Sequence, residues 1–264
     1  MVKLQNDLYC ADMPGSAVLA EGRRYLVKKA ETAEEIQEAQ SLRYRVFKSE
    51  QGRLPACESG KDADFFDTGS IHLLVLEKEH RNVVGTSRMR SGSCAGNCSG
   101  LYSGQEYRFS GLEERLPRTF EVGRSCVDPE FRNGAVVAML WAGIAEVHNR
   151  LKFDYMLGCA SLEHNDCSLA RGIYRKMLEL QLVTSSPHAV VRRGSHLLPG
   201  ETAVLDDSAF QKSLPPLLKG YLKIGAKICG EPAYDRDFNS IDFPIWFDFV
   251  NLPEKYIRHF KVRE

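Results

Sequence analysis

The 264-residue chain has no excess of charge of either sign and no long hydrophobic run. Its 35 basic residues balance 35 acidic ones, which argues against nucleic-acid binding, since such proteins usually carry a basic excess. The longest apolar run, 135–145, is shorter than the roughly 20 residues of a membrane-spanning helix. The first residues, MVKLQNDLYCADMPG, lack the apolar stretch of a secretory signal. We therefore expect a cytoplasmic protein without an integral membrane segment.

The eight cysteines do not have the spacing of a zinc site. Cys94 and Cys98, in SGSCAGNCSG, form a C-x-x-x-C pair, and no second Cys or His pair follows at zinc-finger distance. Without a secretory signal, the cysteines are expected to be reduced thiols. The sequence thus predicts loop cysteines and no metal centre.

Hydrophobic patterning predicts a mixed α/β layout, because strand-like and helix-like segments alternate. A Thr32/Glu35 capping box opens the first helix. No composition shift marks a linker, so we expect an N-terminal extension, 1–22, and a single domain, 23–264, with a C-terminal elaboration. Strands are expected at 23–30, 71–78, 83–90, 119–127, 154–162 and 244–250, and helices at 32–50, 134–149, 166–182 and, briefly, near 112–116.

Charged residues occur inside segments that are otherwise patterned for the core. An unpaired buried charge is costly, so each could belong to a structural salt bridge, and for any one of them that explanation is as good as a functional role. Together they favour a polar cavity that takes a charged small molecule. The residues are Arg43, Asp64, Asp67, Arg88, Glu121 and Arg124.

The segment EVGRSCVDPEFR poses a geometric conflict. Glu121 and Arg124 are three residues apart, so a regular strand would point them to opposite faces. A bulge at Gly123 would bring both to one side and free backbone N–H groups for a reacting carbonyl. The sequence therefore predicts a bulged strand at a catalytic site.

Candidates for the reacting group are few. No G-x-S-x-G elbow occurs, and Cys126 has no histidine nearby in sequence to activate it. Glu121 is then the best candidate for a general base, acting directly or through a water. Arg132 and Gly134 precede a predicted helix, where a phosphate could bind at the helix N-terminus.

Several motifs resemble known families. R-x-x-V-F at 43–47, D-x-F-D at 64–67, Arg88 and E-x-x-R at 121–124 resemble acyl-homoserine-lactone synthases, which have the GNAT (Gcn5-related N-acetyltransferase) fold. The tryptophan that follows V-F there is absent here, where 51–53 read QGR. The chain is more similar to ornithine–acyl-carrier-protein N-acyltransferases over about 23–240, in LRYRVFKSEQG, DADFFDTGSIHLLV, GRSCVDPEFRNG, GCASL and LPPLLKGYLKIGA.

This resemblance implies a GNAT-like mixed sheet, split into a V-shaped cleft between strands 119–127 and 154–162 and flanked by helices. An acceptor amine would attack the donor thioester directly, with Glu121 accepting its proton. Asp64 and Asp67 would hold the acceptor's ammonium groups. The arginines, Arg43, Arg88 and Arg124, would organise those acids or bind the acceptor's carboxylate.

The resemblance also implies that no cofactor is bound and that acyl-phosphopantetheine on acyl carrier protein is the co-substrate. Acetyl-CoA users of this fold carry R/Q-x-x-G-x-G/A before the helix, and Gly134 is out of register with that pattern. A carrier protein presents one phosphodiester, which Arg132 and Gly134 would bind. Candidate docking charges for that acidic partner are Arg132, Arg150, Lys152, Arg192 and Arg193.

The function expected is transfer of a long-chain, 3-hydroxy acyl group to the α-amine of an amino acid, with ornithine the first choice and glycine or glutamine open. The alternatives are an acyl-CoA-dependent acetyltransferase, an acyl-homoserine-lactone synthase, or a non-catalytic module that binds lipid or acyl carrier protein. A lipid product implies peripheral contact with the inner face of the bacterial membrane. The apolar segments PIWFDFVNLP and LPPLLKGYL are candidates for that contact, and core packing is the favoured role of both.

Overall fold

The computed structural model describes residues 13–51, 58–95, 100–162 and 166–251. Cys126, Cys159, Cys167 and Cys229 are not joined in disulfides. The remaining predictions about thiols concern Cys10, Cys57, Cys98 and the side chain of Cys94, which lie outside the described residues, as does the Gly52-Arg53 pair. Among the described residues, no helix is both long enough and apolar enough to span a membrane.

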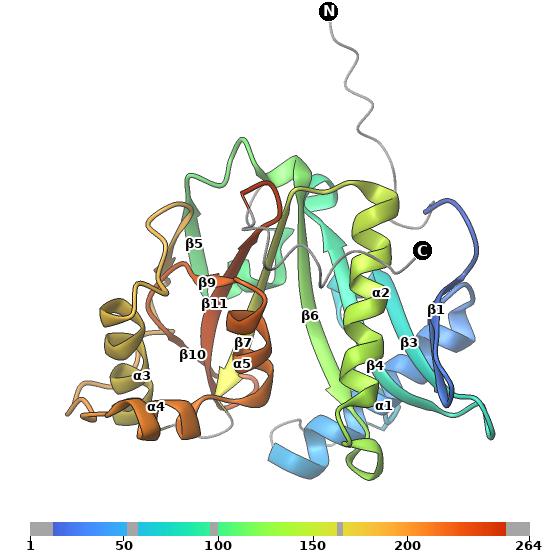
Figure 1. Cartoon of the computed structure of the whole chain (residues 1–264), viewed down its shortest axis with the longest axis horizontal. Coiled ribbons are helices and arrows are strands. Elements are labelled where there is room, and N and C mark those ends of the chain that lie inside the picture. Colours follow the sequence, from blue (N-terminus) through green and yellow to red (C-terminus); the bar gives the residue numbers. More distant parts are fainter. Residues whose placement is uncertain (1–12, 52–57, 96–99, 163–165, 252–264) are drawn as a thin grey trace, which may run out of the picture.

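A nine-stranded mixed sheet forms the framework (Figure 1). Its strands pair antiparallel except for β6 and β7, which run parallel. A two-stranded sheet, β5 (Tyr107–Ser110) with β8 (His188–Val191), lies beside it. In spatial order the large sheet comprises β1 (Val18–Glu21), β2 (Tyr25–Lys29), β3 (Ile71–Glu77), β4 (Val83–Ser91), β6 (Thr119–Val127), β7 (Tyr155–Leu162), β11 (Ser240–Asp248) and β10 (Ala233–Asp235), with β9 (Lys227–Ile228) also pairing β11.

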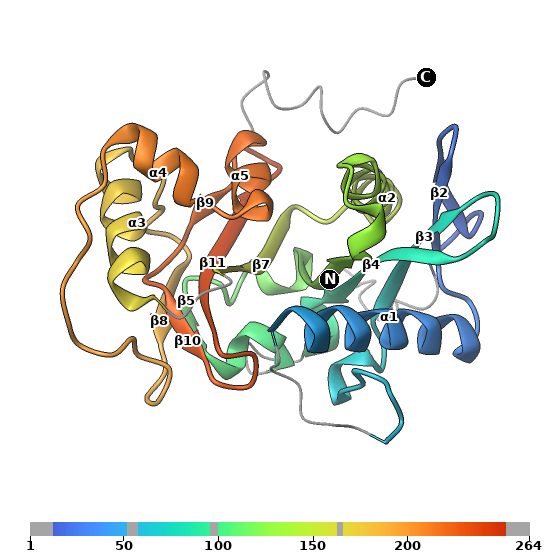
Figure 2. The same cartoon turned by 90° about the horizontal axis from the view of Figure 1, so that it is seen from below.

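Helices cover both faces of the sheet (Figure 2). α1 (Ala33–Gln51) packs on β3, β4 and β6, and α2 (Ala135–Leu151) packs on β1 to β4 from the other side. In the other half, α5 (Pro216–Lys223) contacts β7, while α3 (Cys167–Glu179) packs on α4 (Asp207–Ser213). Short 3-10 turns include η2 (Phe65–Asp67) and η5 (Tyr102–Gln105), which carry residues of the site.

The sheet opens between its two central strands. β6 and β7 pair from Thr119–Tyr155 to Val122–Gly158, and within the described residues the pairing stops there although both strands continue. Figure 1 shows the two strands diverging below that point. The expected mixed α/β, GNAT-like sheet with a V-shaped cleft and flanking helices is confirmed.

Some element boundaries differ from the sequence prediction. β1 forms within the predicted extension, so the sheet begins ahead of residue 23. The helix expected near 112–116 is instead a turn followed by a 3-10 helix, η6 (Leu116–Arg118). Pro117, which has no N–H to donate, leaves room for only one turn there. The last strand begins at Ser240, four residues before the expected start at 244.

The predicted bulge exists, one residue later than expected. Thr86 faces Cys126 and Arg88 faces Gly123, so Arg124 and Ser125 together stand opposite Ser87. Arg124 adopts a left-handed backbone with φ +51°, a conformation that non-glycine residues rarely take. The strained residue is therefore the arginine itself and not Gly123, and contacts of its side chain must hold it.

Gly158 sets how closely the strands approach at the point of the split. A Cβ at Gly158 would lie 2.6 Å from the carbonyl oxygen of Val122, whereas a Cβ at Gly123 would meet nothing within 4 Å. We expect Gly158→Ala to push β6 and β7 apart and lower the free energy of unfolding by about 1–3 kcal/mol. Gly123→Ala is the matched control. Urea unfolding checks this, and equal stability of the two variants would contradict it.

Candidate active site

A cavity of about 110 Å³ opens where the sheet splits. Its walls come from β4, β6, β7, β10 and β11, from η5, and from α5 and the end of α1. Segments far apart in sequence thus meet at one polar pocket inside the fold. Open sheets that split or switch direction commonly bind ligands at this place.

Glu121 faces this cavity from β6. Its side chain is buried, with 5% exposed. Its Oε2 accepts a hydrogen bond from the Tyr102 N–H at 2.6 Å, and its Oε1 accepts from the Ser103 N–H at 2.8 Å. Both N–H groups lie at the start of η5, so this turn fixes the orientation of the carboxylate. Each oxygen keeps a lone pair that can accept a proton.

Arg43 does find the acidic partners that its place on the apolar face of α1 requires. Its side chain is fully buried, and Nη2 lies 3.0 Å from Asp67 Oδ2. Its Nε lies 2.9 Å from Asp62 Oδ2. Gln40 also donates to Asp67 Oδ2 at 2.9 Å. Asp62, which the sequence analysis did not single out, is therefore part of the cluster.

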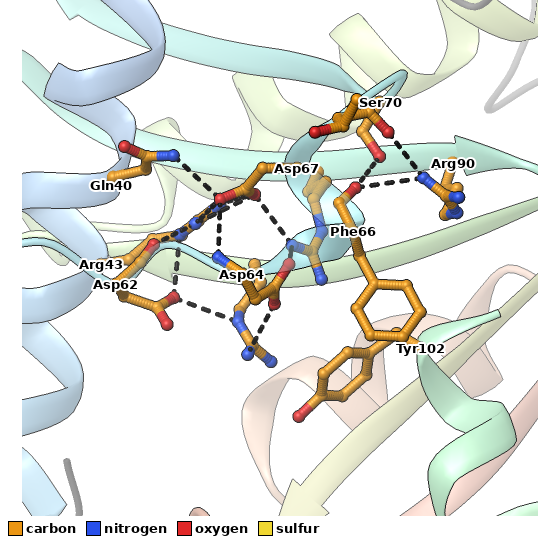
Figure 3. Close-up of polar contacts among 12 residues, drawn as sticks. Gln40, Arg43, Asp62, Asp64, Phe66, Asp67, Ser70, Arg90 and Tyr102 are labelled. Carbon is orange, nitrogen blue, oxygen red and sulfur yellow. Dashed lines mark hydrogen bonds and ion pairs between the residues drawn. The ribbon is translucent and has the colours of Figure 1, made fainter. Parts of the chain in front are cut away.

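The other two arginines complete a balanced network (Figure 3). Arg88 Nη1 lies 2.8 Å from Asp67 Oδ1 and also contacts Asp64 Oδ1. Arg124 donates to Asp62 and Asp64, each at 3.1 Å. Three guanidinium groups thus meet three carboxylates. Asp64 and Asp67 are both engaged by arginines, which fits the expectation that the arginines organise these acids. Binding of an ammonium group by either acid stays a prediction.

Arg124 also connects this network to the cavity. Its guanidinium carbon lies 4.3 Å from the ring centroid of Tyr102 and 4.6 Å from that of Phe238. Both rings line the cavity. The aromatic pair and the two carboxylates hold the arginine from several sides, which offsets its unfavourable backbone conformation.

A second group of acids comprises Asp235 and Asp242, which line the cavity, and Glu106, which lies directly beside Asp242. Carboxylate oxygens of Glu106 and Asp242 lie within 4.8 Å of each other and of the Cys159 sulfur. Burial, and then the charges of Asp242 and Asp235, raises the pKa of Glu106 well above its usual value. Burial, and then Asp235, raises the pKa of Asp242 likewise. The sequence analysis missed these residues, although Asp242 lies between Ile241 and Phe243 in a strand and carried the same signal as Glu121.

Arg90 is a further residue that the sequence analysis missed. It lies two positions after Arg88 in β4, on the same face of the strand, and lines the cavity. It donates to the backbone carbonyls of Thr68 at 2.8 Å and Phe66 at 3.2 Å, and of Gly100 at 3.0 Å. Arg90 therefore fixes the turn that carries Asp64 and Asp67. The spacing R-x-R in a predicted strand could have revealed it.

Arg132 and Gly134 are not among the residues that line the cavity. Arg132 donates to the Val127 carbonyl at 3.3 and 3.2 Å. Gly134 is the N-cap of α2 and has φ +82°. Of the docking candidates, Arg150 donates to Glu146, to carbonyls just before β1 and to the Val18 carbonyl at its start, so it anchors that strand. Phosphate binding by Arg132 and Gly134 stays a prediction.

Comparison with known proteins gives consistent results. Residues 42–142 match the model of the Acetyltransferase (GNAT) domain. L-ornithine N(alpha)-acyltransferase of Brucella abortus is 34% identical over 252 residues, covering 89% of this chain and 88% of that protein. The Agrobacterium fabrum protein of the same name is 32% identical, covering 88% and 83%. The structure of the CoA-dependent acyl-homoserine lactone synthase BjaI, with SAM and isopentyl-CoA, superposes with a TM-score of 0.51 at 15% identity, covering 86% of this chain and 81% of that one.

Proposed function

The chain belongs to the family of the L-ornithine N(alpha)-acyltransferases, and on that premise we propose that it transfers an acyl group to the α-amine of ornithine in the cavity between β6 and β7. The observation that carries the proposal is the buried Glu121 carboxylate. It is oriented by two backbone N–H groups and faces the cavity where the sheet splits. The family relationship names the acceptor, and the cavity supplies acids for a cationic one.

The reaction that fits this site is direct aminolysis of a thioester. The acceptor's α-amine attacks the acyl carbon, and a C–N bond forms while the C–S bond breaks. Glu121 takes the proton that the amine loses, and the phosphopantetheine sulfur leaves as a thiolate that is then protonated. No acyl-enzyme intermediate is required. Cys159 lies half-buried on the cavity wall, and desolvation raises the pKa of its thiol well above the usual value, which suits a neutral wall group.

The donor we propose is a long-chain 3-hydroxyacyl group on acyl carrier protein. The loop before α2 departs from the R/Q-x-x-G-x-G/A pattern of acetyl-CoA users, which supports a donor with one phosphodiester over one with a pyrophosphate. Arg132 and the N-terminus of α2 at Gly134 are the groups that would bind that phosphodiester. The protein needs no bound cofactor for this chemistry.

The product would be an amphiphile and would leave toward the inner face of the membrane. The two apolar segments considered for membrane contact are mostly packed inside the protein, as Trp246, Phe247 and Leu218 are buried. Because α5 and β11 pack in the core, a peripheral membrane contact would use a different part of the protein surface.

The test is an assay with the purified protein, L-ornithine, and the same 3-hydroxyacyl chain on either acyl carrier protein or CoA. We expect N-acylornithine by mass spectrometry, with kcat/KM at least about 10²-fold higher for the carrier-protein thioester. An equal kcat/KM with the CoA thioester would overturn the proposal that acyl carrier protein is the donor. Acylation of glycine or glutamine in preference to ornithine would overturn the acceptor. No product with any amine would favour a non-catalytic binding module.

A further inference from the structure

The arginine network does not neutralise the second group of acids, which are Asp235 and Asp242 in the lining of the cavity and Glu106 beside Asp242. Within the described parts of the chain, no ion pair joins Glu106, Asp235 or Asp242 to a cation, whereas Asp62, Asp64 and Asp67 all have arginine partners. Glu106 is 5% exposed, and its Oε2 has no hydrogen-bond partner among the described residues. A buried acid with a free oxygen is costly unless a ligand completes it.

Resting on the proposed function, we propose that Glu106 and Asp242, assisted by Asp235, bind the side-chain ammonium of the diamino acid acceptor and so determine its selection. The α-amine would then lie toward Glu121. The Arg–Asp network of Arg43, Arg88 and Arg124 serves as a support that holds the turn and the bulge in place.

The geometry suits an ammonium group. Carboxylate oxygens bind such a nitrogen at roughly 2.8 Å, so two oxygens within 4.8 Å of each other can share one nitrogen. Asp235 fixes its own carboxylate through Oδ1, which accepts from the N–H groups of Asp237 at 2.8 Å and Phe238 at 3.1 Å. Ser240 holds Asp242 in the same way, with its Oγ 3.2 Å from Oδ1. These acids are thus positioned before any ligand binds.

The electrostatics point the same way. Burial and repulsion by neighbouring carboxylates raise the pKa of both Glu106 and Asp242. A bound cation reverses that penalty, because it favours the ionised form of each acid. The groups that face Glu106 are Asp242, Asp235, Glu121, Cys159 and the cation Arg124, which opposes the shift. A ligand that brings one positive charge among these acids would therefore balance the site.

The position of these acids in the chain also fits a role in selecting the acceptor. The GNAT match ends at residue 142, so β10 and β11, which carry Asp235 and Asp242, lie beyond it. The shared part supplies Glu121 and the arginine network. Glu106 also lies within the matched part, and the C-terminal part adds Asp235 and Asp242, which complete the proposed site for the side-chain ammonium.

The experiment compares L-ornithine with L-norvaline, which has the same carbon chain without the side-chain amine. We expect the wild-type protein to prefer ornithine by about 10³-fold in kcat/KM, because a site built for a polar group rejects the analogue that lacks it. In Glu106→Gln and Asp242→Asn the ratio should fall to within about tenfold, mainly through KM for ornithine. Asp237→Asn, an exposed acid on the adjacent turn, is the matched control and should keep the wild-type ratio.

Each outcome is decisive. If wild type makes no N-acylornithine, the proposed function fails. If it acylates ornithine and norvaline equally well, or the two variants keep the wild-type ratio, only this inference fails. A chelator that abolishes activity, restored by Zn²⁺, would assign Glu106, Asp242 and Cys159 to a metal instead. Thermal unfolding with and without ornithine gives a second readout, since the ornithine shift should vanish in both variants while the fold is kept.

Discussion

Glu121→Gln is expected to lower kcat for N-acyl transfer by about 10³-fold, within the range that loss of a general base causes. The side chain faces the cavity and both of its oxygens accept backbone N–H groups. Glutamine keeps the shape but cannot take the proton of the attacking amine. Steady-state kinetics with ornithine and the acyl donor measure the effect.

The same variant also disturbs η5, because the amide NH₂ would face one of the two N–H donors. An unsatisfied buried group costs roughly 1–3 kcal/mol, so a loss of stability must be separated from a loss of base catalysis. The pH dependence does this. An α-amine titrates near pH 8, so at about pH 7 most of the acceptor is an ammonium that Glu121 must deprotonate. At about pH 9 the solvent has already removed that proton, so the kcat deficit of the variant should narrow.

If Glu121 only positioned η5, the kcat deficit of Glu121→Gln would not depend on pH. Glu114→Gln, an exposed carboxylate seven residues earlier in the chain, is the control and should keep wild-type kinetics. If Glu121→Gln retains more than about a tenth of the wild-type kcat, direct base catalysis by Glu121 is wrong.

About half of the candidate site could be predicted from the sequence, because one pattern identifies those residues. A charge inside an apolar segment needs a partner, and that signal identified Arg43, Arg88, Glu121 and Arg124. The structure brings the three arginines together with acids of the DADFFD segment. Which acid meets which arginine depends on the 3-10 turn of η2, and sequence spacing does not determine that.

The sequence analysis missed Glu106 and Asp242 for two physical reasons. Glu106 lies between a 3-10 turn and a four-residue strand, where no hydrophobic period exists to mark it as buried. Asp242 lies two residues before the predicted start of the last strand at 244, so it fell outside the segment that the pattern marks as core. The bulge position also depends on side-chain contacts, since Arg124 adopts the strained conformation that Gly123 could take more easily.

Arg43→Met is expected to lower the free energy of unfolding by about 3–5 kcal/mol at pH 7, because it leaves Asp62 and Asp67 buried with less counter-charge. The arginine is fully buried, and methionine fills a similar length without the charge. Arg45→Met is the matched control on the same helix. Arg45 is exposed and lies 3.7 Å from Asp128, so its loss should cost at most about 1 kcal/mol. Urea unfolding measures both.

The pH dependence of this difference identifies its cause. Burial alone would raise the pKa of Asp67, but Arg43 and then Arg88 hold it well below its usual value. A lowered pKa stabilises the folded protein above the unfolded value of about 4, and that contribution is lost as the pH falls below it. The gap between wild type and Arg43→Met should therefore be full at neutral pH and shrink below about pH 4. A gap that stays constant in acid would mean that packing, and not the charge network, holds Arg43 in place.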